Sequence, residues 1–286
     1  MDLSIITVPW NVKNLVRENF KAIYKNTQNI SFEIFAVDND SKDGTADMIR
    51  KEFPRVNLIV NDYNAGFAKA NNQGIKKSSG RYILLLNPDM RVLDGTLEKM
   101  VRWMDKNQKV GISACHLIKK NNETIFHTRF YPTLLDQLVI VLKLPHIFPN
   151  ILNKYLMKNF DYSKEAEVDS VRGSFFMIRK EVIEKLKGLD ERYFIWFEEV
   201  DFCKQVKNAG WKVMYTPVAS CVDYVGKSFA QVERGITQKY FRDSMLKYFK
   251  KWHPGWQRWV LKSAWHIGIF ILFIGDKLNF KSKAKT

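Results

Sequence analysis

The feature that most constrains the fold is a series of short apolar runs separated by longer amphipathic segments. Runs of five or six apolar residues between turn formers are typical of strands buried on both faces, as in a parallel sheet. The spacing of the runs favours βαβ units with right-handed crossovers. We therefore expect an α/β protein with a mostly parallel central sheet flanked by helices. The expected strands are Leu3–Val8, Phe32–Val37, Val56–Val60, Tyr82–Leu86 and Val110–Leu117.

Helical periodicity falls between these runs and continues after them. The expected helices are Asn14–Thr27, Ala46–Phe53, Phe67–Lys77, Gly95–Asp105, Lys180–Lys187 and Glu198–Ala209. Residues 127–163 have no clean period, so their structure is left open. Val168–Arg179 is strand-like around Gly173, and Val213–Tyr215 and Ala219–Val222 are expected as two late strands.

Two acidic motifs lie directly after expected strands. Asp38–Ser41 (Asp-Asn-Asp-Ser) follows Phe32–Val37, and Asn87–Asp89 (Asn-Pro-Asp) follows Tyr82–Leu86. In open α/β sheets the ligand binds outside the carboxyl ends of the strands. We hypothesise that one carboxylate contacts a nucleoside while the other holds a metal ion on its phosphates.

Composition narrows the class of protein. With 286 residues and 46% hydrophobic content, the chain can bury a large core. Its three cysteines lack CxxC spacing, so neither a disulfide framework nor a zinc knuckle is indicated. Asp2 stands where a secretory signal would carry basic residues, so we expect a cytoplasmic protein. The net charge of +16 favours an anionic partner. Residues 231–286 carry twelve Lys and Arg against three Asp and Glu, so much of this charge belongs to the tail.

Five segments stand out by their order and spacing. They are Ala36–Thr45, Asn64–Gly74, Leu84–Asp89, Gly173–Arg179, and Gly188–Glu191 continuing to Glu198–Cys203. Together they resemble the nucleotide-sugar-dependent glycosyltransferases of family 2, and closely the rhamnosyltransferase-like branch, over a match from about Leu3 to Phe229. The resemblance implies a GT-A fold and inverting sugar transfer from a nucleotide-activated donor, with a catalytic domain at 1–230 and a helical tail at 231–286.

The resemblance also implies a divalent cation that neutralises the diphosphate of the donor. Asp89 corresponds to the last carboxylate of the D-x-D motif of the family, with Asn87 in place of the first. Hard oxygen ligands suit Mg²⁺ or Mn²⁺, which act as Lewis acids on phosphates. Asp223 stands where family members often carry a histidine, so it is expected as a second metal ligand, with a surface-loop role as the alternative. For Asp89 the alternative is a turn former after a strand.

The donor is expected to contact the ends of the first strands and the loop Asn64–Gly74, which would close over the nucleoside. Asp38 would accept a hydrogen bond from the base or ribose, while Asn72 either contacts the donor or satisfies the loop backbone. Pro9 replaces the usual asparagine of the family, so the resemblance does not carry over a side-chain contact with the donor at that position. The expected donor-binding residues are Thr7, Asp38, Asn64, Gly66, Asn72, Asn87 and Asp89.

An acceptor hydroxyl is a weak nucleophile, so direct displacement needs a carboxylate to take its proton. Alignment with the Glu-Asp pair of the family identifies Glu199 as this base, although the pair here is Glu198-Glu199. Glu198 and Asp201 are the other candidates. The alternative reading is an acidic first helical turn that the helix dipole favours.

The tail contains an apolar stretch of twelve residues, Ala264–Gly275, which is too short to span a membrane. Tryptophans and basic residues surround it, a pattern typical of an interfacial helix on an anionic membrane surface. We expect a cytoplasmic protein associated peripherally with the inner face of the plasma membrane. The alternative is a helix docked on the catalytic domain.

Together these features predict an inverting, metal-dependent glycosyltransferase of cell-surface polysaccharide biosynthesis. Its donor would be dTDP-rhamnose or a UDP-sugar. Its acceptor would be a saccharide, lipid-linked at the membrane and held by residues 127–163 and the tail. No nucleic-acid partner is expected, because helix-turn-helix, zinc-finger and RNP motifs are absent from the sequence. The alternative function is a catalytically inactive family member that acts as a nucleotide-binding partner subunit.

Overall fold

The computed structural model describes residues 1–224 and 232–268 of the chain. The strands are β1 (Leu3–Thr7), β2 (Phe32–Asn39), β3 (Asn57–Asn61), β4 (Tyr82–Leu86), β5 (Met90–Val92), β6 (Val110–Ile118), β7 (Thr128–Arg129), β8 (Ala166–Glu167), β9 (Ser170–Val171), β10 (Phe175–Arg179) and β11 (Lys212–Asp223). The helices are α1 (Lys13–Asn26), α2 (Thr45–Glu52), α3 (Phe67–Ile75), α4 (Thr96–Lys106), α5 (Leu134–Val141), α6 (Lys180–Leu186), α7 (Glu198–Asn208) and α8 (Arg234–Trp252). Leu144–His146 forms a short 3₁₀ helix, η1, and residues 255–268 are helical.

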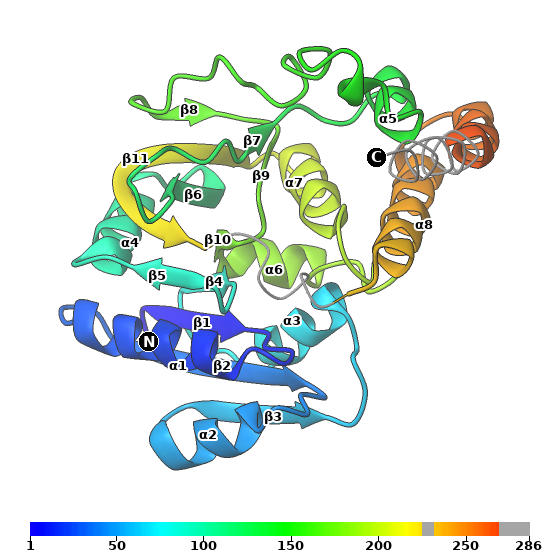
Figure 1. Cartoon of the computed structure of the whole chain (residues 1–286). Helices are drawn as coiled ribbons and strands as arrows, with labels where there is room; N and C mark the ends of the chain where they lie inside the picture. Colours follow the sequence, from blue (N-terminus) through cyan, green and yellow to red (C-terminus); the bar gives the residue numbers. More distant parts are fainter. Residues whose placement is uncertain (225–231, 269–286) are drawn as a thin grey trace.

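One central sheet organises the described part of the chain (Figure 1). Its strand order is β3-β2-β1-β4-β10-β6-β11-β5, and β8 pairs with β11. Strands β1, β2, β3, β4, β6 and β11 point one way, whereas β10, β5 and β8 run against their neighbours. The expected α/β fold with a mostly parallel sheet is therefore confirmed.

Helices cover both faces of the sheet, which explains the continuous apolar runs. Along β4, Leu84 and Leu86 pack in the cluster that contains α1, α2 and α4, while Ile83 and Leu85 pack in the cluster that contains α3, α6 and α7. Successive side chains of a strand point to opposite faces, so a strand buried on both faces is apolar at every position.

Three parts of the sheet differ from the sequence-based prediction. β2 extends through Asp38 and Asn39, because both residues continue the parallel pairing with β3. The two expected late strands are one strand, β11, whose register shifts between Tyr215 and Ser220. The three-residue strand β5 directly follows Asp89 and was not predicted, since it is too short to show alternation.

The described part of the tail packs on the rest of the molecule. In Figure 1, α8 lies beside α7, and residues 255–268 follow it. A third apolar cluster joins residues before and in α7 to residues of both tail helices: Tyr193, Phe197, Val200, Met245, Tyr248, Phe249, Leu261, Ala264 and Trp265. No helix among the described residues is long and apolar enough to cross a membrane. The predicted segments 225–229 and 269–286 lie outside the described residues.

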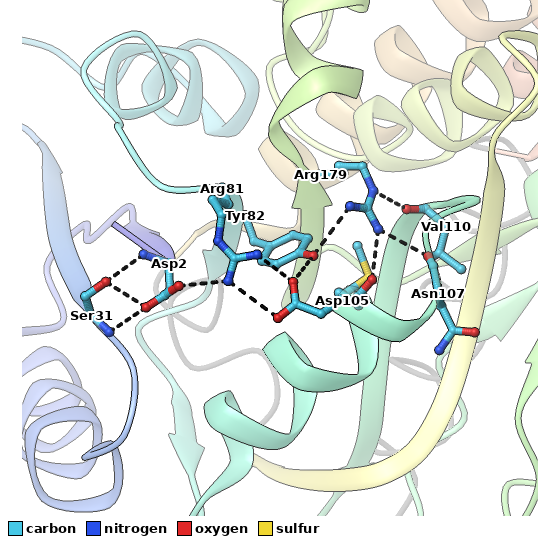
Figure 2. A network of polar contacts seen from close by, with 9 residues as sticks. Asp2, Ser31, Arg81, Tyr82, Asp105, Asn107, Val110 and Arg179 are labelled. Atoms are coloured by element: carbon cyan, nitrogen blue, oxygen red, sulfur yellow. Dashed lines mark hydrogen bonds and ion pairs between the residues drawn. The ribbon is translucent and has the colours of Figure 1, made fainter.

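A polar network closes the end of the sheet where β1 and β4 begin (Figure 2). Arg81 Nη2 lies 2.8 Å from Asp2 Oδ1, and Arg81 Nη1 lies 2.6 Å from Asp105 Oδ1. Tyr82 donates its hydroxyl proton to Asp105, and Arg179 donates to backbone carbonyls at the end of α4. The network ties β1, β4, β10 and α4 together at the end opposite the acidic motifs.

Candidate functional site

Asp89 lies in the turn between β4 and β5, and buried contacts from two sides hold this turn. Asn19 on α1 donates its amide to the carbonyl oxygens of Met90 at 2.8 Å and Asn87 at 3.3 Å. The backbone N–H of Asn87 donates to the carbonyl of Ser174. The side chain of Asp89 is largely buried as a result.

Strand pairing brings Asp223 next to Asp89. Asp223 is opposite Met90 where β11 pairs with β5, and the N–H of Tyr224 donates to the carbonyl of Asp89. Asp223 Oδ2 lies 3.4 Å from Arg172 Nη1. Both carboxylates line a cavity of about 230 Å³, together with Asn87, Arg129, Arg172, Trp196, Glu198 and Glu199.

The chain enters α7 through a strained turn that places two glutamates at the same cavity. Trp196 and Phe197 have positive φ angles of 62° and 68°, a conformation that non-glycine residues adopt at a cost of about 1–3 kcal/mol each. Glu198 and Glu199 then begin α7, where the positive end of the helix dipole favours carboxylates.

Burial dominates the electrostatics of these glutamates. Burial and the neighbouring Glu199 raise the pKa of Glu198 well above its ordinary value. Burial also raises the pKa of Glu199, while Arg129 and Arg172 act in the opposite direction. The Oε2 atom of each glutamate has no hydrogen-bond partner among the described residues. A carboxylate of raised pKa facing a cavity is well suited to accept a proton.

Asp201, the third candidate base, does not line the cavity. Its fully buried carboxylate accepts hydrogen bonds from Trp252 Nε1 at 2.6 Å, Lys251 Nζ at 2.8 Å and Gln205 Nε2 at 2.7 Å. Asp201 therefore anchors α8 on α7, which is a structural role.

A second cavity of about 370 Å³ adjoins the first, and both are lined by Val8, Phe67 and Ile195. Its other lining residues include Trp10, Asn39, Asn64, Gly66, Phe194 and Tyr240. Gly66 has a φ of +80°, and a Cβ there would lie 2.5 Å from the carbonyl oxygen of Phe194. Asn64 accepts a hydrogen bond from the N–H of Gly66. The Asn64–Gly66 loop thus depends on glycine to approach the segment before α7.

Three predicted donor-binding residues line neither cavity. Asp38 is buried, accepts a hydrogen bond from the N–H of Ser41, and has a pKa raised by burial. Thr7 is buried at the end of β1. The Asn72 amide donates to the carbonyl of Leu189 at 2.8 Å and accepts from its N–H at 2.9 Å. Asn72 therefore holds the chain near Leu189, and direct donor contact by these three residues stays a prediction.

Arg129 and Arg172 line the first cavity but were not predicted as site residues. Single arginines give no periodic signal, and Arg129 lies in the region whose structure the sequence left open. A larger cavity, of about 820 Å³, lies at the other end of the sheet beside Arg81 and Arg179. The arginines there already bond to protein groups, as Figure 2 shows, so we place the functional site at the first two cavities.

The carboxylate ligands at the first cavity suit a metal cation that also binds a substrate phosphate. The described residues contain no group of three or more His, Cys, Asp or Glu side chains placed to hold a metal. Two carboxylates, Asp89 and Asp223, nevertheless meet at the cavity. Mg²⁺ is usually held by one or two carboxylates plus substrate phosphates and water, so this pair fits a metal bound with a diphosphate.

Sequence comparison relates this chain to a known family. The family model described as "Glycosyl transferase family 2" matches residues 4–187. The N-acetylglucosaminyl-diphospho-decaprenol L-rhamnosyltransferase of Mycobacterium tuberculosis H37Rv is 22% identical over 247 residues, covering 81% of this chain and 80% of that protein. The β-1,3-glucosyltransferase WfgD of Escherichia coli, which acts from UDP-Glc on α-D-GlcNAc-diphosphoundecaprenol, is 28% identical over 124 residues, covering 43% of this chain and 49% of that protein.

Among solved structures, the mannosyltransferase PcManGT of Pyrobaculum calidifontis in complex with GDP-Man and Mn²⁺ has a TM-score of 0.59. It is 17% identical, and the superposition covers 97% of this chain and 80% of that one. At this identity the similarity shows a shared fold.

Proposed function

Because the chain belongs to glycosyltransferase family 2, we propose that it transfers a sugar, with inversion, from a nucleoside-diphosphate donor to a saccharide acceptor. The observation that carries this proposal is the placement of Glu199. Its unpartnered Oε2 belongs to a side chain that lines the same cavity as Asp89 and Asp223. A proton acceptor and a diphosphate site in one cavity are what direct displacement at a sugar carbon requires.

In this mechanism Asp89 and Asp223 would hold Mn²⁺ or Mg²⁺. The bound ion would supply Lewis-acid stabilisation of the negative charge on the departing nucleoside diphosphate. Glu199 accepts the proton of the acceptor hydroxyl as this oxygen attacks the sugar. The partly buried position of Glu199 limits its hydration, which raises its affinity for that proton.

The nucleoside would occupy the second cavity, beside Asn64 and Gly66. The aromatic side chains that line this cavity, Trp10, Phe194 and Tyr240, offer surfaces on which the flat base can pack. We propose dTDP-rhamnose as the first candidate donor and a UDP-sugar as the second, as the names of the mycobacterial and E. coli relatives suggest. Both names contain a saccharide on a polyprenyl diphosphate, which supports a lipid-linked acceptor and a role in cell-surface polysaccharide biosynthesis.

A lipid-linked acceptor would place the enzyme at a membrane surface, and the last described helix offers a suitable face. Residues 255–268 bury Leu261, Ala264 and Trp265 against the protein. Trp256 and Trp259 are more than half exposed, at 58% and 62%. Lys262 lies over the ring of Trp259, at 5.1 Å from its centre. Exposed tryptophan with neighbouring cations supports peripheral association with an anionic leaflet.

The decisive variant for the catalytic assignment is Glu199→Gln, which keeps the shape of the side chain and removes its basicity. We expect transfer to fall by about 10²–10⁴-fold, as for the loss of a general base, with little change in nucleotide affinity. Glu181→Gln is the matched control, because Glu181 is an exposed glutamate in the first turn of α6. Sugar transfer and nucleotide binding would be measured on the same preparations.

Unchanged transfer by the Glu199→Gln variant would refute Glu199 as the base. If the unaltered protein bound nucleotide but transferred no sugar to any acceptor in a lipid-linked panel, the alternative of an inactive nucleotide-binding subunit would be favoured instead.

A further inference from the structure

The first cavity contains two guanidinium groups that the proposed reaction does not use. Arg129 ends β7, and Arg172 directly follows β9. The two strands pair antiparallel with Arg129 opposite Ser170, and the N–H of Arg172 donates to the carbonyl of His127. Arg129 and Arg172 are therefore diagonal neighbours on one face of this ribbon, a spacing that long side chains can bridge.

The hydrogen-bonding capacity of this pair is largely unused by the protein. Within residues 1–224 and 232–268, the Arg129 guanidinium has no hydrogen bond or ion pair. Arg172 meets the carboxylate of Asp223 through Nη1, at 3.4 Å. A guanidinium has five N–H donors, so this pair can offer several hydrogen bonds to a ligand in the cavity.

The chemistry of the pair identifies the ligand class. The planar fork of arginine matches the oxygen atoms of phosphate, and two arginines side by side can share the charge of one group. Glu198 and Glu199 lie in the same cavity but in the first turn of α7, and neither makes an ion pair with these arginines in the described structure. A phosphate oxygen would satisfy donors that these carboxylates leave unsatisfied.

We propose that Arg129 and Arg172 form a phosphate-binding subsite that holds a diphosphate group of a substrate beside the Asp89–Asp223 pair. This inference rests on the proposed function, because the diphosphate would belong either to the nucleotide donor or to a lipid-linked acceptor. Both sources present the same diphosphate chemistry. Arg129 contributes to nucleotide affinity only if the diphosphate belongs to the nucleotide donor.

The test is isothermal titration of the full chain with inorganic pyrophosphate in the presence of EDTA, which removes the contribution of a metal. We expect Arg129→Ala to weaken pyrophosphate binding at least tenfold, and Arg129→Lys to weaken it less, since lysine keeps the charge and loses the fork. Because the Arg129 guanidinium bonds to no acceptor in the part of the chain that the structure describes, its removal should leave thermal unfolding unchanged. Arg102→Ala, at an exposed position on α4, is the matched control and should bind as the unaltered protein does.

Equal pyrophosphate affinity of the Arg129→Ala variant and the unaltered protein would overturn the proposal. The source is then resolved by titrating both proteins with nucleoside diphosphate and Mn²⁺. A parallel tenfold loss assigns the subsite to the donor, and unchanged nucleotide affinity assigns it to the acceptor. Glu199→Gln should retain pyrophosphate binding, so a failure of the catalytic assignment would be separable from a failure of this subsite.

Discussion

At the scale of single residues, the environment of a side chain decides its role more than its type does. Glu199 and Asp201 are both acidic residues of the first turn of α7. Glu199 faces a cavity, whereas Asp201 is surrounded by donors from α8. The sequence places both in one motif and cannot separate them, because the α8 donors to Asp201, Lys251 and Trp252, lie about fifty positions further along the chain.

His127 provides a prediction about pH. Its imidazole is fully buried between Tyr162 and Tyr215, and neither ring nitrogen has a hydrogen-bond partner among the described residues. Burial, with smaller effects of nearby His116, Arg172 and Arg129, lowers the pKa of His127 to about 3. Between pH 6.5 and 3 the unfolded chain binds a proton that the folded protein does not.

This difference makes acid destabilise the fold through His127. The contribution of neutral His127 to the free energy of unfolding is fully present above pH 6.5. It falls by about 1.4 kcal/mol for each pH unit below that value. We expect His127→Phe to lose less unfolding free energy between pH 7.5 and pH 5 than the unaltered protein, as measured by urea denaturation. His146→Gln, at an exposed position in η1, is the control. The same acid sensitivity in His127→Phe would contradict the assignment.

The candidate site was predictable where residues follow a motif and unpredictable where it depends on tertiary pairing. Asp89 and Glu199 were predicted from motifs, and both line the first cavity. Arg129 and Arg172 meet only because two very short strands pair across an irregular region. Asn72 shows the opposite case: its position in a motif is clear, but its amide bonds to the chain near Leu189.

At the scale of elements, the strands buried on both faces were the most predictable, because every position is apolar. Tyr82–Leu86 was predicted with the bounds it has as β4. Strand β5 has only three residues and β11 contains an interruption, so neither shows a clear period. Their pairing nevertheless brings Asp89 and Asp223 together. The proximity of these two carboxylates therefore cannot be predicted from a local sequence pattern.

The contact between α7 and α8 predicts an unequal pair of lysine substitutions. Lys251 forms an ion pair with the fully buried Asp201 at 2.8 Å, while the adjacent Lys250 is exposed. Removing one partner of a buried pair leaves an uncompensated charge, at a cost of about 3–5 kcal/mol. Since Lys251 is partly exposed, we expect the lower end of this range for Lys251→Met.

Lys250→Met is the control and should change the unfolding free energy by less than about 0.5 kcal/mol, as is usual for exposed positions. Chemical denaturation of the two variants measures the difference directly. Similar stabilities would mean that Asp201 does not depend on Lys251.

At the scale of the whole molecule, the two ends of the sheet differ in structure. The beginnings of β1 and β4 are closed by the Arg81–Asp105 network, and the opposite end holds the two adjoining cavities. The tail helices pack near α7, on the side of the site. A membrane-facing surface on residues 255–268 would thus belong to the same packed unit as α7, which begins with Glu198 and Glu199.

This arrangement predicts that vesicle binding depends on the exposed tryptophans. We expect the Trp256→Ser/Trp259→Ser double variant to bind anionic phospholipid vesicles at least tenfold more weakly in a sedimentation assay. Binding of the unaltered protein should weaken as salt rises, because the cations of the tail are screened. Tyr63→Ser, at a half-exposed aromatic position far along the chain from the tail, is the control. Undiminished binding of the double variant would exclude this helix as the contact surface.

The anchoring of α8 by Asp201 also matters to anyone who wishes to shorten this protein. A cut after residue 230 follows the sequence-based domain boundary and would remove the basic, apolar tail. It would also remove the apolar partners of Tyr193, Phe197 and Val200 that lie in the tail, and leave Asp201 without two of its donors. Phe197, Val200 and Asp201 lie within two residues of Glu199, so the minimal enzyme should be sought with α8 retained.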